Sequence, residues 1–207
     1  MKPHDVYLFV FDGLSDWEIG YAVAGINNPQ FQLNPGRYRV RTVSLQGASV
    51  LTVGGIRIEP DLALGSLSPK DSAMLILPGG AAWEAGQNME AVALARTFLI
   101  AGVPVAAICG ATAALARGGL LDRHRHTSNA LEYLAATGYR GASFYEDSPA
   151  VTDGNLITAA GTAPLEFAEH IFRRLNLYAP AVLDAWCGLF KTGEPEYFGA
   201  LMQATEA

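Results

Sequence analysis

The residues best suited to chemistry in this sequence stand where an apolar run meets a segment of small residues. Residues 103–108 are apolar and strand-like, Cys109 follows them, and Gly110 opens an Ala- and Leu-rich segment typical of a helix. A cysteine in this place lies at the carboxyl end of a buried strand, where open α/β folds put their active sites. The helix N-terminus favours thiolate over thiol. The pattern therefore predicts a nucleophilic Cys109, whereas most free cysteines are small buried hydrophobes.

Two acids and three glycines are candidates to assist this thiol. Glu18 and Asp16 both follow the first apolar run, and spacing alone does not choose between them. A carboxyl that reached the sulfur would be partly or wholly protonated, because burial and a thiolate both disfavour its charge; the alternative is a solvated acid in the first turn of a helix. Gly79 and Gly80 follow another apolar run, and with Gly110 they offer backbone amides to an oxyanion or simply form a tight turn.

The histidines supply no evident catalytic pattern. His124 and His126 lie in the charged segment D-R-H-R-H, and one of them could act as a base, although a solvated loop is the usual role of such residues. Cys187 stands between aromatic residues and is expected in the core. No set of His, Cys, Asp and Glu has metal-ligand spacing, so the sequence predicts neither a metal nor another cofactor.

Length and composition restrict the class of protein. The 207 residues suit one compact domain, and 50% of them are hydrophobic, enough for a sheet buried on both faces. The net charge of −6 argues against a nucleic-acid or anionic-membrane partner. Two cysteines far apart in the sequence form no disulfide framework, which suits the reducing cytoplasm. The first apolar run is too short for a signal peptide or a membrane span.

Strand-like and helical segments alternate along the chain, which predicts a parallel sheet covered by helices on both faces. Two turn signals, Gly54-Gly55 and Asp153-Gly154, add antiparallel hairpins. The candidate residues would then converge at the carboxyl ends of the strands. Strands are expected at residues 6–11, 38–45, 73–77, 103–108 and 156–160, and helices at residues 16–26, 88–101, 131–136 and 165–175, with two short helical segments in residues 180–202 broken at residues 193–195.

Four blocks of this sequence, in order, resemble the ThiJ/PfpI superfamily, which includes relatives of class I glutamine amidotransferase domains. They are V-Y-L-F-V-F-D-G-L-S-D-W-E-I, L-I-L-P-G-G, A-I-C-G-A-T-A-A-L and L-I-T-A-A-G-T-A-P-L-E-F-A. The resemblance implies a flavodoxin-like α/β/α sandwich, often a homodimer, in which a reactive cysteine on a strained nucleophile elbow is contacted by a glutamate matching Glu18. This ranks Glu18 above Asp16. Residues 1–177 would form the family domain, and residues 178–207 a C-terminal helical extension packed on it.

Departures from the family pattern narrow the function. Gly110 stands where many hydrolases of the family have histidine, and the stretch H-T-S-N puts Asn129 where others carry a histidine, with His126 three residues earlier. The segment G-T-A-P-L-E lacks the histidine that glutamine amidotransferases need, so amidotransfer is not expected. About 30 residues after residue 175 are too few for the helix-turn-helix domain of some relatives.

Three functions remain open at this stage. The favoured hypothesis is a cysteine-dependent enzyme, glyoxalase-like, deglycase or hydrolase, in which Cys109 attacks a small carbonyl or amide substrate with help from Glu18. The second is a non-catalytic stress protein that senses oxidants through Cys109. The third is a binding or scaffold module that keeps the fold and has an inert cysteine.

Overall fold

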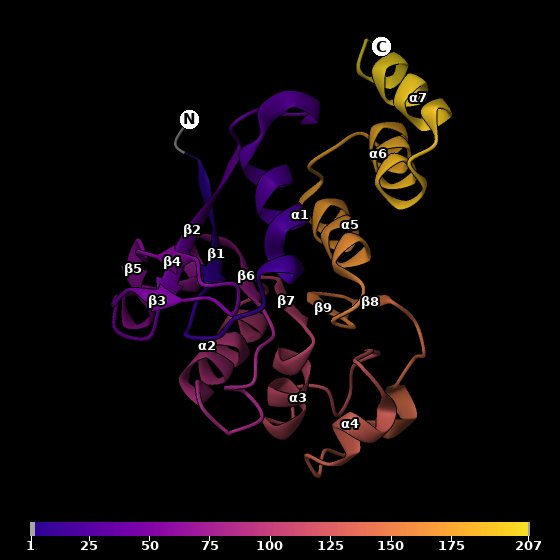
Figure 1. Cartoon of the computed structure of the whole chain (residues 1–207). Coiled ribbons are helices and arrows are strands. Elements are labelled where there is room, and N and C mark those ends of the chain that lie inside the picture. The colour runs from indigo at the N-terminus through magenta and orange to yellow at the C-terminus, as the bar shows by residue number, and fades with distance from the viewer. Residues whose placement is uncertain (1–2, 207) are drawn as a thin grey trace.

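A seven-stranded sheet forms the centre of the molecule, which a computed structural model describes over residues 3–206. The strand order is β5-β2-β1-β6-β7-β9-β8, and every neighbouring pair is parallel except β8 with β9 (Figure 1). The strands of this sheet are β1 (His4–Phe9), β2 (Tyr38–Ser44), β5 (Leu62–Ala63), β6 (Ser72–Leu77), β7 (Val105–Ile108), β8 (Ala150–Asp153) and β9 (Leu156–Ala159). The predicted α/β fold with a mostly parallel sheet is confirmed.

Helices cover both faces of this sheet. On one face α1 (Asp16–Asn27) packs against α5 (Pro164–Leu175), and on the other α2 (Met89–Ile100) packs against α3 (Gly110–Arg117), which gives three layers (Figure 1). The central strands are buried on both sides, so β7 reads as an unbroken apolar run rather than an alternating one. A short helix, α4 (Leu131–Ala135), and four 3₁₀ turns at Pro29–Phe31, Leu64–Ser66, Pro69–Asp71 and Ala142–Phe144 complete this part of the chain.

Both predicted hairpins are present, and the first strand differs slightly from its prediction. Strands β3 (Val50–Leu51) and β4 (Arg57–Ile58) pair antiparallel around Gly54-Gly55, as β8 and β9 do around Asp153-Gly154. Strand β1 covers residues 4–9 rather than 6–11. Val10 and Phe11 stay buried, but they have left the strand and lead into the turn that reaches α1. Outside the named strands, one isolated bridge pairs His126 with Tyr145.

The strand order brings the candidate residues to one edge. In an open α/β sheet the chain reverses its direction of winding at one point, here between β1 and β6, and ligand sites form outside the carboxyl ends of the strands there. The segments that follow β1, β6, β7 and β9 meet at this edge. They carry Glu18, Gly79, Cys109 and Gly161 respectively.

Two further helices follow the sandwich. Helices α6 (Pro180–Thr192) and α7 (Pro195–Glu206) pack against each other, and the chain turns between them at Gly193, whose φ of 72° suits glycine. The predicted break at residues 193–195 is therefore confirmed. Helix α6 packs on α5, so this pair lies beside the α1–α5 face (Figure 1).

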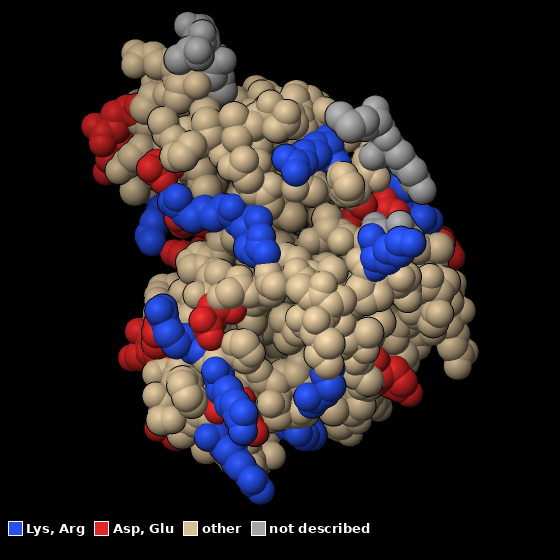
Figure 2. Space-filling model, turned by 180° about the vertical axis from the view of Figure 1, so that it is seen from behind, with Lys and Arg blue, Asp and Glu red and all other residues tan. Residues whose placement is uncertain are grey.

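The surface mixes charges of both signs. On the face seen from behind, lysine and arginine side chains lie beside aspartate and glutamate (Figure 2). Ion pairs such as Arg125 with Glu146, at 2.6 Å, and Arg173 with Glu169, at 2.8 Å, are of this kind. Within residues 3–206, the helices are all too short or too polar to cross a membrane.

Candidate active site

Cys109 occupies a strained turn between a strand and a helix. Cys109 has φ 56° and ψ −124°, and it is the N-cap of α3, directly after β7. A positive φ is uncommon for a residue with a Cβ, and such strain costs about 1–3 kcal/mol and concentrates at functional sites. The turn is held from both sides: the Cys109 N–H donates to Ala159 O at 3.0 Å, and its carbonyl accepts from the Thr112 N–H at 3.0 Å. Cys109 is half-buried.

Glu18 is buried beside this thiol. Its side chain comes from the first turn of α1, the residue is 1% exposed, and Oε2 accepts a 2.5 Å hydrogen bond from the Gly79 N–H. Burial raises the pKa of the carboxyl, while the Gly79 N–H and the Cys109 thiol act in the opposite direction. Oε1 is buried and has no hydrogen bond within the described residues. The Cys109 side chain is nevertheless close enough to influence the pKa of the carboxyl. Glu18 therefore keeps one oxygen free for a proton.

The thiol itself is less acidic than the sequence predicts. Burial raises the pKa of Cys109, and the neighbouring Glu18 carboxylate raises it further. The side chain of Asn129 and the N–H of Gly110 lower that pKa but do not outweigh burial. The expectation of a thiolate stabilised by the helix N-terminus is wrong in its net direction. Burial raises the pKa of both Cys109 and Glu18, and a negative charge on one disfavours a negative charge on the other, so the two groups titrate as a coupled pair.

Asn129 connects the thiol to the loop after β9. Its Nδ2 donates to Cys109 Sγ at 3.4 Å, and its Oδ1 accepts from the Gly161 N–H at 2.8 Å. Gly161 approaches so closely that a Cβ added there would lie 2.8 Å from Sγ. The sequence analysis did not name Gly161 as a site residue. The signal was available in the fourth block, where this glycine follows β9 directly.

The three glycines named as oxyanion donors play different parts. The Gly79 N–H is engaged by Glu18, so it is not free for an oxyanion. The Gly110 N–H is directed at the sulfur, whose charge it stabilises. A Cβ on Gly110 would lie 2.9 Å from Gly80 O and 3.3 Å from Gly80 N, so the two loops touch here. Within residues 3–206 the Gly80 N–H has no hydrogen bond, which leaves it as the available backbone donor.

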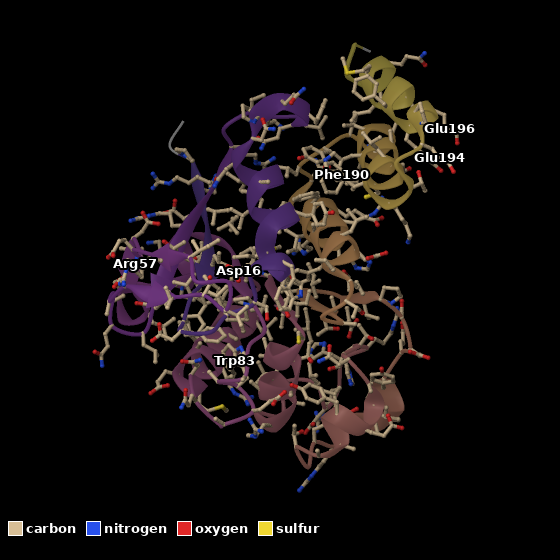
Figure 3. The ribbon with its side chains drawn as sticks, viewed as in Figure 1. Asp16, Arg57, Trp83, Phe190, Glu194 and Glu196 are labelled. Carbon is tan, nitrogen blue, oxygen red and sulfur yellow. The ribbon has the colours of Figure 1, made fainter. Side chains whose placement is uncertain are left out.

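The loop after β6 is fixed by an aromatic anchor. Trp83, labelled in Figure 3, is fully buried, and its indole N–H donates to Pro78 O at 2.8 Å. Its own carbonyl accepts from Arg117 Nη1 of α3 at 2.9 Å. The anchor holds Gly79 and Gly80 in place against the elbow.

Asp16 does not reach the thiol. Its Oδ2 accepts from the Gly54 N–H at 2.7 Å, and hydrogen bonding from Thr52 lowers its pKa. Figure 3 shows Asp16 at the start of α1. Its contacts hold the hairpin of β3 and β4 to the helix, so the Asp16 interpretation as an accessory acid is not supported by its position.

His126 also lies elsewhere. It is fully buried, Nδ1 bonds to His124 O at 2.7 Å and Nε2 to Tyr139 Oη at 3.3 Å. Burial lowers its pKa. Both ring nitrogens are thus engaged in the core, and His124 pairs with Asp153 at 3.0 Å. Neither histidine is placed as a base for Cys109. In the described part of the chain, no cluster of three His, Cys, Asp or Glu could hold a metal ion.

Comparison with known proteins decides the family. A sequence model of the DJ-1/PfpI family matches residues 4–174. The chain belongs to the DJ-1/PfpI family. The Bacillus subtilis protein named uncharacterized protease YoaZ is 41% identical over 205 residues, 98% of each chain. A ThiJ/PfpI family crystal structure from Bacillus anthracis superposes with a TM-score of 0.91 at 42% identity, covering 100% of this chain and 99% of the other.

Other members of the DJ-1/PfpI family carry a more specific name. A Thermococcus kodakarensis protein named a deglycase is 27% identical over 155 residues, 74% of this chain and 88% of its own. The family model ends at residue 174, before α6, whereas the Bacillus anthracis structure covers the whole chain. The two C-terminal helices therefore have a counterpart in that structure.

Proposed function

We propose that this protein is a cysteine-dependent enzyme that acts on a small reactive carbonyl compound, in the manner of a glyoxalase or deglycase. The observation that carries the proposal is the pairing of a strained Cys109 with a buried Glu18 whose Oε1 is free. Relatives named deglycase support the substrate class.

The first step is an addition in which the pair shares one proton. Sγ of Cys109 attacks the carbonyl carbon while the thiol proton passes to the Glu18 carboxylate. The electron pair of the C=O bond moves to oxygen, and the resulting alkoxide takes the proton back from Glu18. Burial raises the pKa of this carboxyl, which makes it a stronger base than an exposed glutamate. The Gly80 N–H is the candidate donor for the developing oxyanion.

A 1,2-dicarbonyl substrate can complete a turnover with this pair and water alone. Glu18 moves a proton from the carbon bonded to sulfur to the neighbouring carbonyl carbon. The hydroxyl proton on the first carbon is transferred to the oxygen of the second, so the first carbon becomes a carbonyl and the product is a thioester of a 2-hydroxy acid. Water then hydrolyses the thioester and returns the Cys109 thiol. For methylglyoxal the sum is substrate plus water giving lactate, with no external oxidant or reductant.

Amide hydrolysis is the less favoured alternative for this site. An amine leaving group must be protonated as it departs, which usually requires a well-placed general acid such as histidine. His126 is held in the core by His124 O and Tyr139, so the site lacks that group. Glutamine amidotransfer remains unexpected because the segment G-T-A-P-L-E lacks the histidine that it needs.

Oxidant sensing through Cys109 is also less favoured. Oxidation to sulfenic acid starts from the thiolate. Burial raises the pKa of Cys109, so little thiolate is present at neutral pH. Mass spectrometry after mild peroxide tests this role, which would require oxygen to be added at Cys109 in preference to Cys187.

The enzyme proposal is tested with purified Cys109→Ala and methylglyoxal as substrate, measuring lactate. We expect at least a hundredfold loss, since removal of a nucleophile typically costs several orders of magnitude. Cys187→Ala is the matched control, because Cys187 is a second free thiol that lies on α6, and burial raises its pKa to about 12. Unchanged turnover in Cys109→Ala would contradict the proposal.

A further inference from the structure

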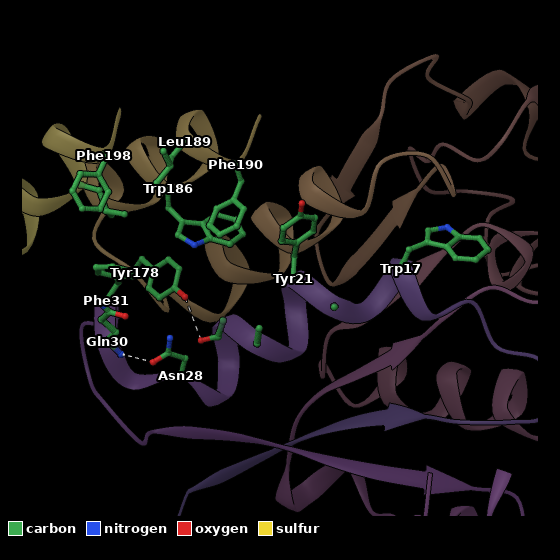
Figure 4. Close-up of a pocket in the computed structure, with 14 residues that line it drawn as sticks. Trp17, Tyr21, Asn28, Gln30, Phe31, Tyr178, Trp186, Leu189, Phe190 and Phe198 are labelled. Carbon is green, nitrogen blue, oxygen red and sulfur yellow. Dashed lines mark hydrogen bonds between the residues drawn. The ribbon is translucent and has the colours of Figure 1, made fainter. Parts of the chain in front are cut away.

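A second hollow lies away from the cysteine site, between α1 and the two C-terminal helices. Its volume is about 730 Å³, and it opens between the outer face of α1, the turn that follows it, and α6 and α7 (Figure 4). Neither Cys109 nor Glu18 lines it. The lining residues are Trp17, Gly20, Tyr21, Ala24, Gly25, Asn28, Gln30, Phe31, Tyr178, Trp186, Leu189, Phe190, Phe198 and Leu201.

Aromatic rings form most of its wall. Trp186 is 6% exposed and meets Tyr21 edge to face at 6.0 Å and Phe190 at 4.6 Å between ring centroids. Large aromatic side chains are unusually exposed at the mouth: Trp17 is 58%, Phe190 50% and Phe198 57% exposed. Exposed apolar surface of this kind commonly marks a binding site.

The cavity has no charge but offers hydrogen-bond donors. None of its described lining residues is acidic or basic. The Tyr178 hydroxyl donates to Gly25 O at 3.3 Å, and Asn28 Oδ1 accepts from the Gln30 N–H at 3.1 Å. Within residues 3–206 the amide nitrogen of Asn28 and the indole nitrogen of Trp186 donate no hydrogen bond, and both side chains line the cavity (Figure 4).

We propose that this cavity binds an uncharged, largely apolar small molecule that carries a hydrogen-bond acceptor. The volume lies within the roughly 300–1,000 Å³ of ligand pockets, and such pockets combine apolar walls with a few placed polar groups. A charged ligand would lose its hydration and find no opposite charge here. The amide of Asn28 or the indole N–H of Trp186 would donate to the acceptor, and the apolar body would pack against the rings of Tyr21, Tyr178 and Phe190.

Gly20 allows the cavity to be blocked without disturbing the helix. It lies on the cavity side of α1, has no left-handed φ, and a Cβ added there meets no atom within 4 Å. Gly20→Leu therefore fills the hollow and also improves helix propensity. Gly199→Leu is the matched control, because Gly199 is an interior residue of α7 with the same open surroundings and does not line the cavity.

Asn28→Asp tests the acceptor. Asn28 is exposed, and an aspartate in its place keeps the oxygen that accepts from the Gln30 N–H while it replaces the amide donor by a negative acceptor. The fold is therefore preserved, whereas a ligand acceptor loses its partner. We expect affinity to fall about tenfold, the effect of one lost hydrogen bond combined with repulsion.

The experiment is a fluorescence titration of the full chain with Nile red, a neutral aromatic dye with a carbonyl acceptor, alongside the anionic dye anilinonaphthalene sulfonate. The proposal expects saturable one-to-one binding of Nile red, weaker binding of the anion, at least about tenfold weaker binding by Gly20→Leu, and unchanged binding by Gly199→Leu and Cys109→Ala. Sedimentation is measured on the same samples.

Three results would overturn the proposal. One is the absence of saturable Nile red binding by the wild type, and another is equal binding by the wild type and Gly20→Leu. The third is a sedimentation result in which the wild type is a dimer, Gly20→Leu is a monomer, and Nile red does not compete with dimer formation. That result would make the hollow an interface between two copies. Because Cys109→Ala keeps the cavity intact, failure of the enzyme proposal leaves this result unaffected.

Discussion

Substitution of Gly161 by alanine places one methyl group against the reactive sulfur. The added Cβ would lie 2.8 Å from Cys109 Sγ, 2.9 Å from Cys109 Cβ and 3.3 Å from Asn129 Oδ1. Ordinary contacts between such atoms are about 3.5–4.0 Å. Gly161 does not have a left-handed φ, so its backbone accepts alanine and the collision with Cys109 is the main effect.

The size of the effect follows from this overlap. Relief of the contact needs a shift of about 0.7 Å, the difference between about 3.5 Å and the present distance. Overpacking of this kind costs about 1–3 kcal/mol, against which alanine recovers about 0.4–1 kcal/mol through the unfolded state. Misplacement of a reacting atom by about 1 Å lowers the rate by about 10²-fold. We therefore expect a modest loss of stability and a large loss of turnover.

Urea unfolding followed by tryptophan fluorescence measures the stability term, and methylglyoxal turnover measures the rate. Gly65→Ala is the control, since its added Cβ meets no atom within 4 Å. The decisive comparison uses Cys109→Gly as background, where both colliding atoms are absent. In this background, the loss of unfolding free energy caused by Gly161→Ala should nearly vanish. An equal cost in both backgrounds would refute the explanation by collision with Cys109.

Three more predictions follow from the same contacts. Burial raises the folded-state pKa of Glu18 above 4.5, so the wild type should lose stability relative to Glu18→Gln as pH rises from about 4.5 through that pKa. Thermal unfolding of both proteins across this pH range measures the effect. A stability difference that is constant with pH argues against a buried titrating carboxyl. Asn129→Ala removes a hydrogen bond that lowers the pKa of Cys109, so the iodoacetamide pH profile should move to higher pH. His126→Gln should lower the melting temperature by several degrees and leave alkylation of Cys109 unchanged, because His126 is a core residue; a slower alkylation would place it in the site after all.

Most of the fold could be predicted because its signals are local. Buried parallel strands give unbroken apolar runs, and the turn signals Gly54-Gly55 and Asp153-Gly154 mark the two hairpins. The two-residue strand β5 had no such signal. It exists only because Leu62 and Ala63 pair with β2, which depends on the packed sheet rather than on the local sequence. The end of β1 was misplaced for a similar reason, since Val10 and Phe11 are as apolar as the strand but belong to the turn after it.

The choice between Asp16 and Glu18 shows where sequence reasoning stops. Two residues apart on a helix, they point about 200° away from each other, so only one can face the sulfur. The rotation of α1 about its axis decides which one, and the packing of Ala22 and Ile26 against the core fixes that rotation. The resemblance to known proteins ranked Glu18 first, and the structure places it beside Gly79 and Cys109. The homodimer and the cytoplasmic location stay predictions.

The acidity of Cys109 illustrates why position in a fold does not determine reactivity by itself. The backbone N–H at the helix N-terminus and the amide of Asn129 stabilise a thiolate, but each carries only a partial charge. Desolvation opposes the full negative charge of the thiolate and therefore has the larger effect on the pKa of Cys109. A second negative charge on Glu18 adds to the penalty. The doubly negative state of the pair is therefore disfavoured, and in the singly negative state the sulfur and the carboxyl compete for one proton. Under the proposed function, the nucleophile is produced by transfer of that proton to Glu18 as the substrate carbon approaches, so Glu18 would control both the acidity of Cys109 and the return of the proton to the product oxygen.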